Sequence, residues 1–148
     1  MAYTNLRVHL IWSTKDRKPS IAEAFQEDIY AYIGGILRKR KHSLLAAGGA
    51  EDHIHLLVSM HPAQSISDCV RDLKSNSSVW VHEHFPKRKT FQWQTKYGAF
   101  SVSESSVESV KTYIANQKEH HKKLTFKEEF TALLRKHGIQ FDPRYVFE

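Results

Sequence analysis

The sequence is poor in the residues that cross-link a chain or interrupt regular structure. Among 148 residues it has one cysteine, four prolines and six glycines. A lone Cys69 excludes an internal disulfide framework and suits a reducing compartment. Repeats, low-complexity tracts and apolar runs long enough to cross a bilayer are missing, as is a signal-peptide pattern. We therefore expect one cytoplasmic domain over residues 1–148, with no membrane partner.

Positive charge is in excess. The formal net charge is +6 and the isoelectric point is about 9.4. Such a balance favours a polyanionic partner, and nucleic acid before a membrane surface. The basic residues cluster at 38–42, 87–89 and 118–123. Lysine-rich helix ends and turns produce similar runs, so each cluster alone is a weak signal.

Residues 51–60 hold the most informative pattern, with His53 and His55 at the start of an apolar run. Side chains of a strand alternate between its faces, so both histidines share one face and the apolar residues the other. Two adjacent imidazoles are spaced to bind one metal ion or one phosphate. Two polar residues at an exposed strand edge give the same pattern. The pair therefore needs a third ligand and a nucleophile elsewhere.

Residues 107–118 supply both candidates. Their apolar positions recur at helical spacing, and Ser105 followed by Glu108 forms a capping-box pattern that predicts the helix start. Tyr113 and Gln117 are four residues apart, which places them one turn apart on the same face of one helix. A tyrosine hydroxyl can act as a nucleophile, and a glutamine oxygen suits a hard metal ion. The alternative is a half-buried packing tyrosine and a solvated glutamine.

With both patterns in this order, the chain resembles the single-tyrosine transposases of the HUH endonuclease superfamily, of the insertion-sequence-two-hundred type. The His-hydrophobic-His motif falls on residues 53–55 and the Tyr-x-x-x-Gln motif on residues 113–117. The resemblance covers nearly the whole chain. It implies a metal-dependent transposase that cleaves and rejoins single-stranded DNA at hairpin-marked ends through a 5′-phosphotyrosine intermediate.

The resemblance also implies roles for single residues. Tyr113 becomes the catalytic nucleophile, and His53, His55 and Gln117 become ligands of Mg²⁺ or Mn²⁺. His121, one turn beyond Gln117, is a further candidate ligand. The family forms homodimers in which the tyrosine helix can complete the histidine site of the partner, so we expect a homodimer here.

Single-stranded or hairpin DNA is the partner that the resemblance implies. Trp93 and Tyr97 are candidates for stacking on a base, although packing in the core explains them equally well. The residues expected to contact DNA are Arg7, His9, Arg38, Lys39, Arg40, Lys41, Lys87, Arg88 and Lys89.

The order of the expected elements predicts an α+β fold. Strands are expected at 3–13, 43–50, 53–60 and 91–103, and helices from 19, from 65, from 105 and from 125. The first six elements read β-α-β-β-α-β, the order of a ferredoxin-like (RRM-like) antiparallel sheet with helices on one face. The C-terminal catalytic helix must cover part of the other face if the two motifs are to meet.

Capping patterns also predict where the other three helices begin. Ser20 with Glu23 and Thr125 with Glu128 form capping boxes, and Ser65 is expected to cap the second helix.

Two alternatives remain open. A domesticated relative, similar to the REP-associated tyrosine transposases, would process chromosomal hairpin repeats with the same catalytic residues. A non-catalytic nucleic-acid-binding module of the same fold would bind hairpins and cleave nothing, because the fold alone does not decide function.

Overall fold

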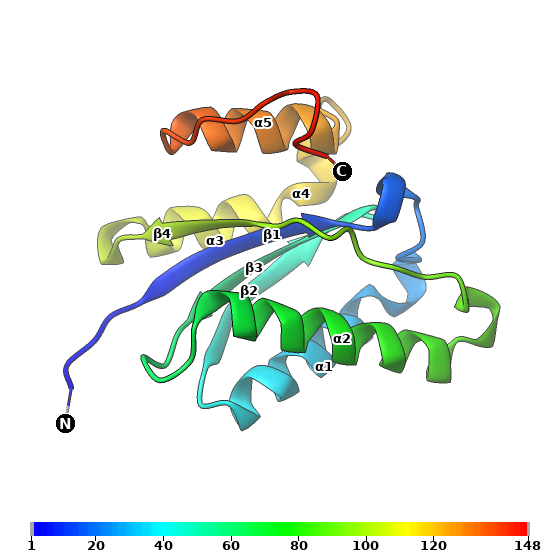
Figure 1. Cartoon of the computed structure of the whole chain (residues 1–148), viewed down its shortest axis with the longest axis horizontal. Coiled ribbons are helices and arrows are strands. Elements are labelled where there is room, and N and C mark those ends of the chain that lie inside the picture. Colours follow the sequence, from blue (N-terminus) through cyan, green and yellow to red (C-terminus); the bar gives the residue numbers. More distant parts are fainter. Residues whose placement is uncertain (1, 148) are drawn as a thin grey trace.

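A four-stranded antiparallel sheet lies between two layers of helices in the computed structural model, which describes residues 2–147 (Figure 1). The sheet order is β2-β3-β1-β4, and α1 and α2 are the helices of the two β-α-β units. This is the predicted ferredoxin-like α+β arrangement. The elements of this part are β1 (Arg7–Ser13), α1 (Glu23–Lys39), β2 (Ser43–Gly49), β3 (His53–Ser59), α2 (Ile66–His84) and β4 (Gly98–Val102).

The main core lies between the sheet and the α1–α2 layer. Leu10 on β1 and Leu56 on β3 are partners in the antiparallel register, and both are fully buried. They belong to one apolar cluster with Ile29 of α1 and Leu73 of α2. The alternation of the strands therefore assigns this face to the core, as predicted, and leaves the histidine row on the opposite face.

Three further helices cover the histidine face of the sheet: α3 (Val107–Ala115), α4 (Gln117–His120) and α5 (Phe126–Lys136). Figure 1 shows α3 and α5, yellow and orange, on the side of the sheet away from α1 and α2. Separate apolar clusters form beneath Ile114 of α3 and beneath Phe130 of α5. The sheet is thus buried on both faces, and the histidines lie inside the molecule.

Two glycines let the second layer approach the sheet closely. A Cβ on Gly48 of β2 would lie 2.4 Å from the carbonyl oxygen of Ile114. A Cβ on Gly98 of β4 would lie 2.9 Å from the Phe130 ring. Since no side chain fits between these backbones and helices, the glycines set the height of α3 and α5 above the sheet.

Two of the predicted helix starts are confirmed. The Ser65 side chain accepts a hydrogen bond from the Asp68 amide at the start of α2. Thr125 and Glu128 form the complete capping box of α5. Local sequence is enough to predict these two starts, because a capping side chain acts within three residues.

Two other predicted starts are wrong. The α1 helix begins at Glu23 without a side-chain cap, because the Ile21 amide bonds to the Glu51 carbonyl and keeps the preceding segment extended. The capping box expected from Ser105 is replaced by a 3-10 turn over Glu104–Ser106, in which the Ser105 and Ser103 hydroxyls contact each other. Tertiary and short-range side-chain contacts replace the cap in these cases.

The first and last predicted strands are shorter than expected. β1 begins at Arg7, where pairing with both neighbours begins, and β4 occupies only Gly98–Val102 of the segment expected to be extended. Trp93 forms an isolated bridge with Thr14, and its ring nitrogen donates to the Ser77 hydroxyl in the core. Packing thus accounts for Trp93. Among residues 2–147, no helix is long and apolar enough to cross a membrane.

Candidate active site

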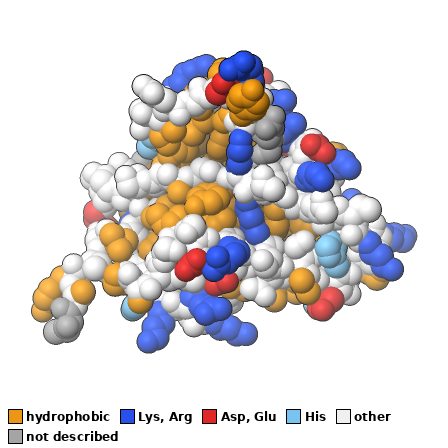
Figure 2. Space-filling model, viewed as in Figure 1, with side chains coloured by type: hydrophobic (Ala, Val, Ile, Leu, Met, Phe, Trp, Pro, Cys, Tyr) orange, Lys and Arg blue, Asp and Glu red, His pale blue; other side chains and the backbone are white. Residues whose placement is uncertain are grey.

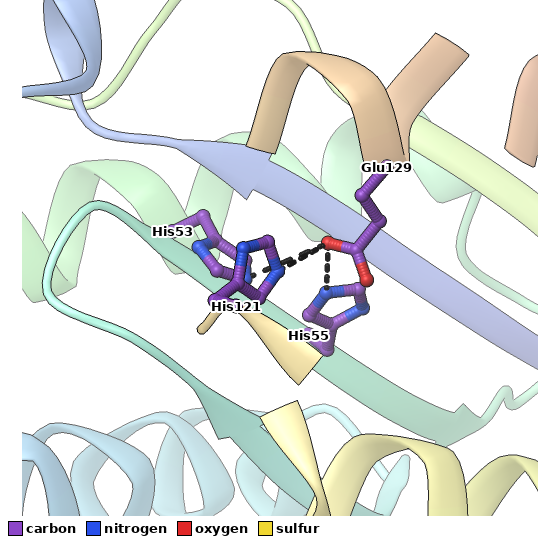
Figure 3. A group of neighbouring side chains, drawn as sticks. All are labelled: His53, His55, His121 and Glu129. Atoms are coloured by element: carbon purple, nitrogen blue, oxygen red, sulfur yellow. Dashed lines mark hydrogen bonds and ion pairs between the residues drawn. The ribbon is translucent and has the colours of Figure 1, made fainter. Parts of the chain in front are cut away.

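His53 and His55 lie side by side on β3, and both side chains are fully buried (Figure 3). The Nδ1 atom of His53 lies 2.7 Å from the Asp52 carboxylate, and the Nδ1 atom of His55 lies 2.8 Å from Nε2 of His9. These partners fix both rings with Nε2 directed to a common centre. Histidines that bind metals are held in the same way, through the ring nitrogen that does not bind the metal.

The carboxylate of Glu129, on α5, occupies that centre. Its Oε1 atom lies 3.0 Å from Nε2 of His55, 2.9 Å from Nε2 of His121 and 3.6 Å from Nε2 of His53. The ligand atoms of these four residues all lie within 4.8 Å of one another. Figure 3 shows the four side chains converging from β3, from α5 and from the segment that follows α4. Four donors at this separation fit one metal ion.

Sequence reasoning missed Glu129, although the sequence holds a signal for it. Glu129 is 1% exposed and lies on the apolar stripe of α5, between the buried residues Phe126, Phe130 and Leu134. An acidic residue in the middle of such a stripe is rarely buried without a partner. The histidines of β3 are that partner.

Tyr113 and Gln117 reach the same carboxylate from above the sheet. The Tyr113 hydroxyl donates to Oε2 of Glu129, and the Gln117 amide donates to the same oxygen at 3.0 Å. The Tyr113 ring also lies edge-on to the His55 ring, with 5.7 Å between their centroids. The structure thus brings together Tyr113, Gln117, His121 and the two β3 histidines within one chain.

The prediction that one helix carries both Tyr113 and Gln117 is wrong in detail. The α3 helix ends at Ala115, Asn116 has φ −96° and ψ 16°, and α4 begins at Gln117. This break lets the chain turn down toward the sheet, where Gln117 is 1% exposed. Its Oε1 atom lies 3.0 Å from Nε2 of His53.

The Gln117–His53 contact bears on metal binding. His53 faces an oxygen acceptor at each ring nitrogen, namely Asp52 Oδ1 and Gln117 Oε1. A neutral imidazole has one N–H, so it can donate to only one of them. With the proton on Nδ1, the Nε2 lone pair faces the Gln117 oxygen and the Glu129 carboxylate. Converging lone pairs of this kind are the donor set of a cation site.

Burial controls the protonation of the site. Burial lowers the pKa of His55 to about 4, although the hydrogen bond to Glu129 partly offsets the shift. Burial and the neighbouring His55 lower the pKa of His9 to about 3. For Glu129, burial alone would raise the pKa, but hydrogen bonds from His121 and His55 outweigh it and the pKa falls far below its usual value. Glu129 is therefore an anion beside the neutral imidazoles of His55 and His9 at neutral pH.

The pKa of Tyr113 shifts in the opposite direction to that of Glu129. Burial, and then its hydrogen bond to the anionic Glu129, raise the pKa of Tyr113 well above its ordinary value near 10. In this state the phenol keeps its proton and points it at Glu129. A nearby cation would be needed to favour the phenolate, because opposite charge within a few ångströms lowers the pKa of a phenol.

Most of the residues expected to contact DNA lie at the surface, whereas Arg7 is ion-paired and His9 is buried. Arg38, Lys39, Arg40 and Lys41 are exposed at the end of α1, and Lys87 and Arg88 belong to a 3-10 turn after α2 that Lys89 follows. Figure 2 shows basic side chains over the layer formed by α1 and α2, and others around α5. Arg7 pairs with Glu104 at 3.2 Å. His9 is 4% exposed and lies behind His55 rather than on the surface.

Comparisons with known proteins show that the chain is similar to transposases. The family model described as "Transposase IS200 like" matches residues 2–117. The ISDra2 transposase TnpA of Deinococcus radiodurans is 27% identical over 117 residues, covering 76% of this chain and 84% of the relative. The transposase for insertion sequence element IS200 of Salmonella typhimurium is 28% identical over 127 residues, covering 80% of each.

Two solved structures share the fold. A putative transposase from Deinococcus radiodurans R1 superposes with a TM-score of 0.66 at 28% identity, covering 78% of this chain and 93% of that one. A REP-associated tyrosine transposase bound to a REP hairpin superposes with a TM-score of 0.62 at 14% identity, covering 82% of this chain and 72% of that one. The second likeness bears on the fold alone.

Proposed function

The chain belongs to the IS200-like transposase family, and from this premise we propose that it is a metal-dependent transposase of single-stranded DNA with Tyr113 as its nucleophile. It cleaves a strand at hairpin-marked ends and rejoins it through a 5′-phosphotyrosine intermediate. The observation that carries this proposal is the convergence of the Tyr113 hydroxyl and both β3 histidines on one buried carboxylate.

The residues present fit a divalent metal ion. Three imidazole nitrogens and one carboxylate oxygen converge, and Gln117 adds an amide oxygen beside His53. We propose His53, His55, His121 and Glu129 as ligands, with Gln117 as a further ligand, for Mn²⁺ or Mg²⁺. When bound, such an ion acts as a Lewis acid that neutralises a phosphate oxygen and holds the phosphate in place. The imidazoles favour Mn²⁺, because Mg²⁺ prefers oxygen ligands.

The chain's own residues account for the proton and the new bond. Glu129 Oε2, which already accepts the hydrogen bond of the Tyr113 hydroxyl, is placed to take its proton once cationic charge in the site has lowered the pKa of Tyr113. The phenolic oxygen then attacks phosphorus, the bond between phosphorus and the 3′ oxygen breaks, and the proton taken up by Glu129 passes to the 3′ oxygen to give a free 3′-hydroxyl. In the reverse direction a 3′-hydroxyl attacks the phosphotyrosine and the tyrosine recovers its proton. The ester conserves the bond energy, so rejoining needs no nucleotide cofactor.

The partner is single-stranded or hairpin DNA. Support comes from the basic side chains over α1 and α2 and from membership of a transposase family. We propose that the basic residues at 38–41 and 87–89 position the DNA backbone, because phosphate contacts carry most of such affinity. The reaction takes place at the chromosome, in the cytoplasm.

We also propose a homodimer whose catalytic sites are each assembled within one chain. Tyr113, His55 and Glu129 meet without a second subunit. Gly48 of β2 lies directly beneath Ile114 and lets α3 pack closely on the sheet of its own chain.

The decisive test is incubation with single-stranded DNA from both flanks of the gene, in Mn²⁺ and in a chelator. We expect a covalent protein–DNA adduct that denaturing gels separate and that mass spectrometry maps to Tyr113. Hairpin binding without any adduct would instead support a non-catalytic binding module. Adducts on scattered chromosomal repeats, but not on the flanks, would support a domesticated hairpin-processing enzyme.

A further inference from the structure

A cavity of about 520 Å³ opens beside the Tyr113 ring, and the chemistry proposed above leaves it unused. On one side it is bounded by β4, by the 3-10 turn Glu104–Ser106 and by α3. Phe100, Val110 and Tyr113 line this side. On the other side it is bounded by the end of α5, through Leu133, Lys136 and His137. Its volume falls within the range of small-molecule sites.

The lining suits one part of a nucleic acid. Apolar side chains form its inner wall, serine hydroxyls line the side of β4 and α3, and Lys136 lies exposed at the rim. None of the described residues that line it carries a carboxylate. Such a site can hold a flat apolar group with hydrogen-bonding edges and an anion beside it, which is the chemistry of a nucleotide.

His137 is held as a rigid platform at this cavity. Its ring stacks on Phe100, with 4.3 Å between centroids and 20° between planes, and its Nδ1 atom contacts the Leu133 carbonyl at 2.8 Å. Phe100 is 2% exposed, whereas His137 is exposed. An exposed aromatic ring that two contacts hold in place loses little entropy when a base stacks on it.

We propose that this cavity binds one unpaired nucleotide of the DNA strand, adjoining the phosphate that Tyr113 attacks. The base lies against Leu133, Val110 and His137, and Lys136 pairs with its phosphate. The inference rests on the proposed function, because Tyr113 contributes to both the cavity and the chemistry. It adds a position at which the protein itself selects a base.

The residues that α5 contributes to the cavity bear on which base it prefers. Leu133, Lys136 and His137 all follow residue 117, where the match to the family model ends. The β4 and α3 side of the cavity lies within that match. The base preference at this position is therefore set by α5 and is expected to vary among family members whose C-terminal helices differ.

The test is photo-crosslinking with 5-iodo-2′-deoxyuridine monophosphate, followed by peptide mapping. We expect crosslinks on Phe100, Tyr113 or the segment 133–137. Leu133→Trp fills the cavity and should lower the crosslink yield about tenfold, the loss expected for one stacked base. Ala132→Trp, an exposed neighbour on the same helix, is the matched control and should leave the yield unchanged.

Two results would overturn the inference: crosslinks confined to other surfaces, or a yield that Leu133→Trp and Ala132→Trp affect equally. The readout needs no cleavage, so it is separate from the covalent chemistry of Tyr113. A protein that forms no adduct with DNA but crosslinks in the cavity would refute the proposed chemistry alone. A protein that forms the adduct but does not crosslink there would refute the cavity alone.

Discussion

The Tyr113 hydroxyl donates a hydrogen bond to the carboxylate of Glu129, which lies 16 residues further along the chain and on another helix. The same carboxylate contacts His55 and His121. One anion thus joins the proposed nucleophile to the proposed metal ligands. It is also placed to receive the nucleophile's proton.

Tyr113→Phe should abolish the covalent adduct and leave DNA affinity within about twofold of the wild type, because phosphate contacts elsewhere supply the binding free energy. The ring and its contact with His55 remain, so the protein should fold. Denaturing gels and a filter-binding titration measure both quantities. An adduct that persists in this variant would identify a different nucleophile.

Glu129→Gln should weaken Mn²⁺ binding by about 100-fold or more. Replacing even a residue that only hydrogen-bonds to a metal ligand lowers metal affinity roughly 10–100-fold. Calorimetric titration measures the affinity, and circular dichroism checks that α5 is intact. Glu119→Gln is the matched control, because Glu119 is exposed and pairs only with Lys122 at 2.9 Å among the contacts of the described residues. Equal Mn²⁺ affinity in both variants would remove Glu129 from the ligand set.

Gly48→Ala should destabilise the protein by about 1–3 kcal/mol, the usual cost of overpacking. The new methyl group would meet the Ile114 carbonyl at 2.4 Å and push α3 away from the sheet. Adduct formation should fall with it, because Tyr113 is on the same helix. The control is Gly35→Ala in α1, where nothing lies within 4 Å of the new Cβ. That change should stabilise the helix by roughly 0.5–1 kcal/mol, as urea unfolding can measure.

Stability should fall as the pH drops below about 6.5, the pKa of an unfolded-state histidine. His9 and His55 have folded-state pKa values lowered to about 3 and about 4, so the unfolded chain binds their protons first. The free energy of unfolding should decrease by up to about 1.4 kcal/mol per pH unit for each histidine until the folded-state pKa is reached. Above about pH 7 the two histidines no longer make the free energy of unfolding depend on pH.

Urea unfolding of chelator-treated protein at several pH values measures this slope. His9→Gln should reduce it, because one buried imidazole is removed. His84→Asn, which replaces an exposed histidine on α2, is the control and should keep the wild-type slope. An unchanged slope in His9→Gln would show that His9 does not contribute.

Mixing Tyr113→Phe protein with a His53→Ala, His55→Ala protein should not restore the adduct. In the proposed dimer each site takes its tyrosine and histidines from one chain, so neither subunit of a mixed dimer would have a complete set. Subunit exchange is confirmed with differently tagged chains. Rescue of cleavage would show instead that the tyrosine helix completes the site of the partner subunit.

The sequence by itself determined the sheet, the two-sided strands and the two motifs. Period-two alternation in β1 and β3 assigns Leu10 and Leu56 to the core and His53 and His55 to the other face, because the strand geometry allows no other arrangement. The starts of α2 and α5 were readable for a similar reason, since a capping side chain acts within three residues.

Only the tertiary structure decided how the site is completed. Glu129 and His55 are 74 residues apart, and no local pattern connects them. The break at Asn116, which brings Gln117 down to the sheet, and the burial of His9 behind His55 likewise depend on the helices that cover the histidine face. Side-chain periodicity reports which face a residue occupies. Which distant residue it meets there depends on how closely α3 and α5 approach the sheet, and Gly48 and Gly98 set that distance.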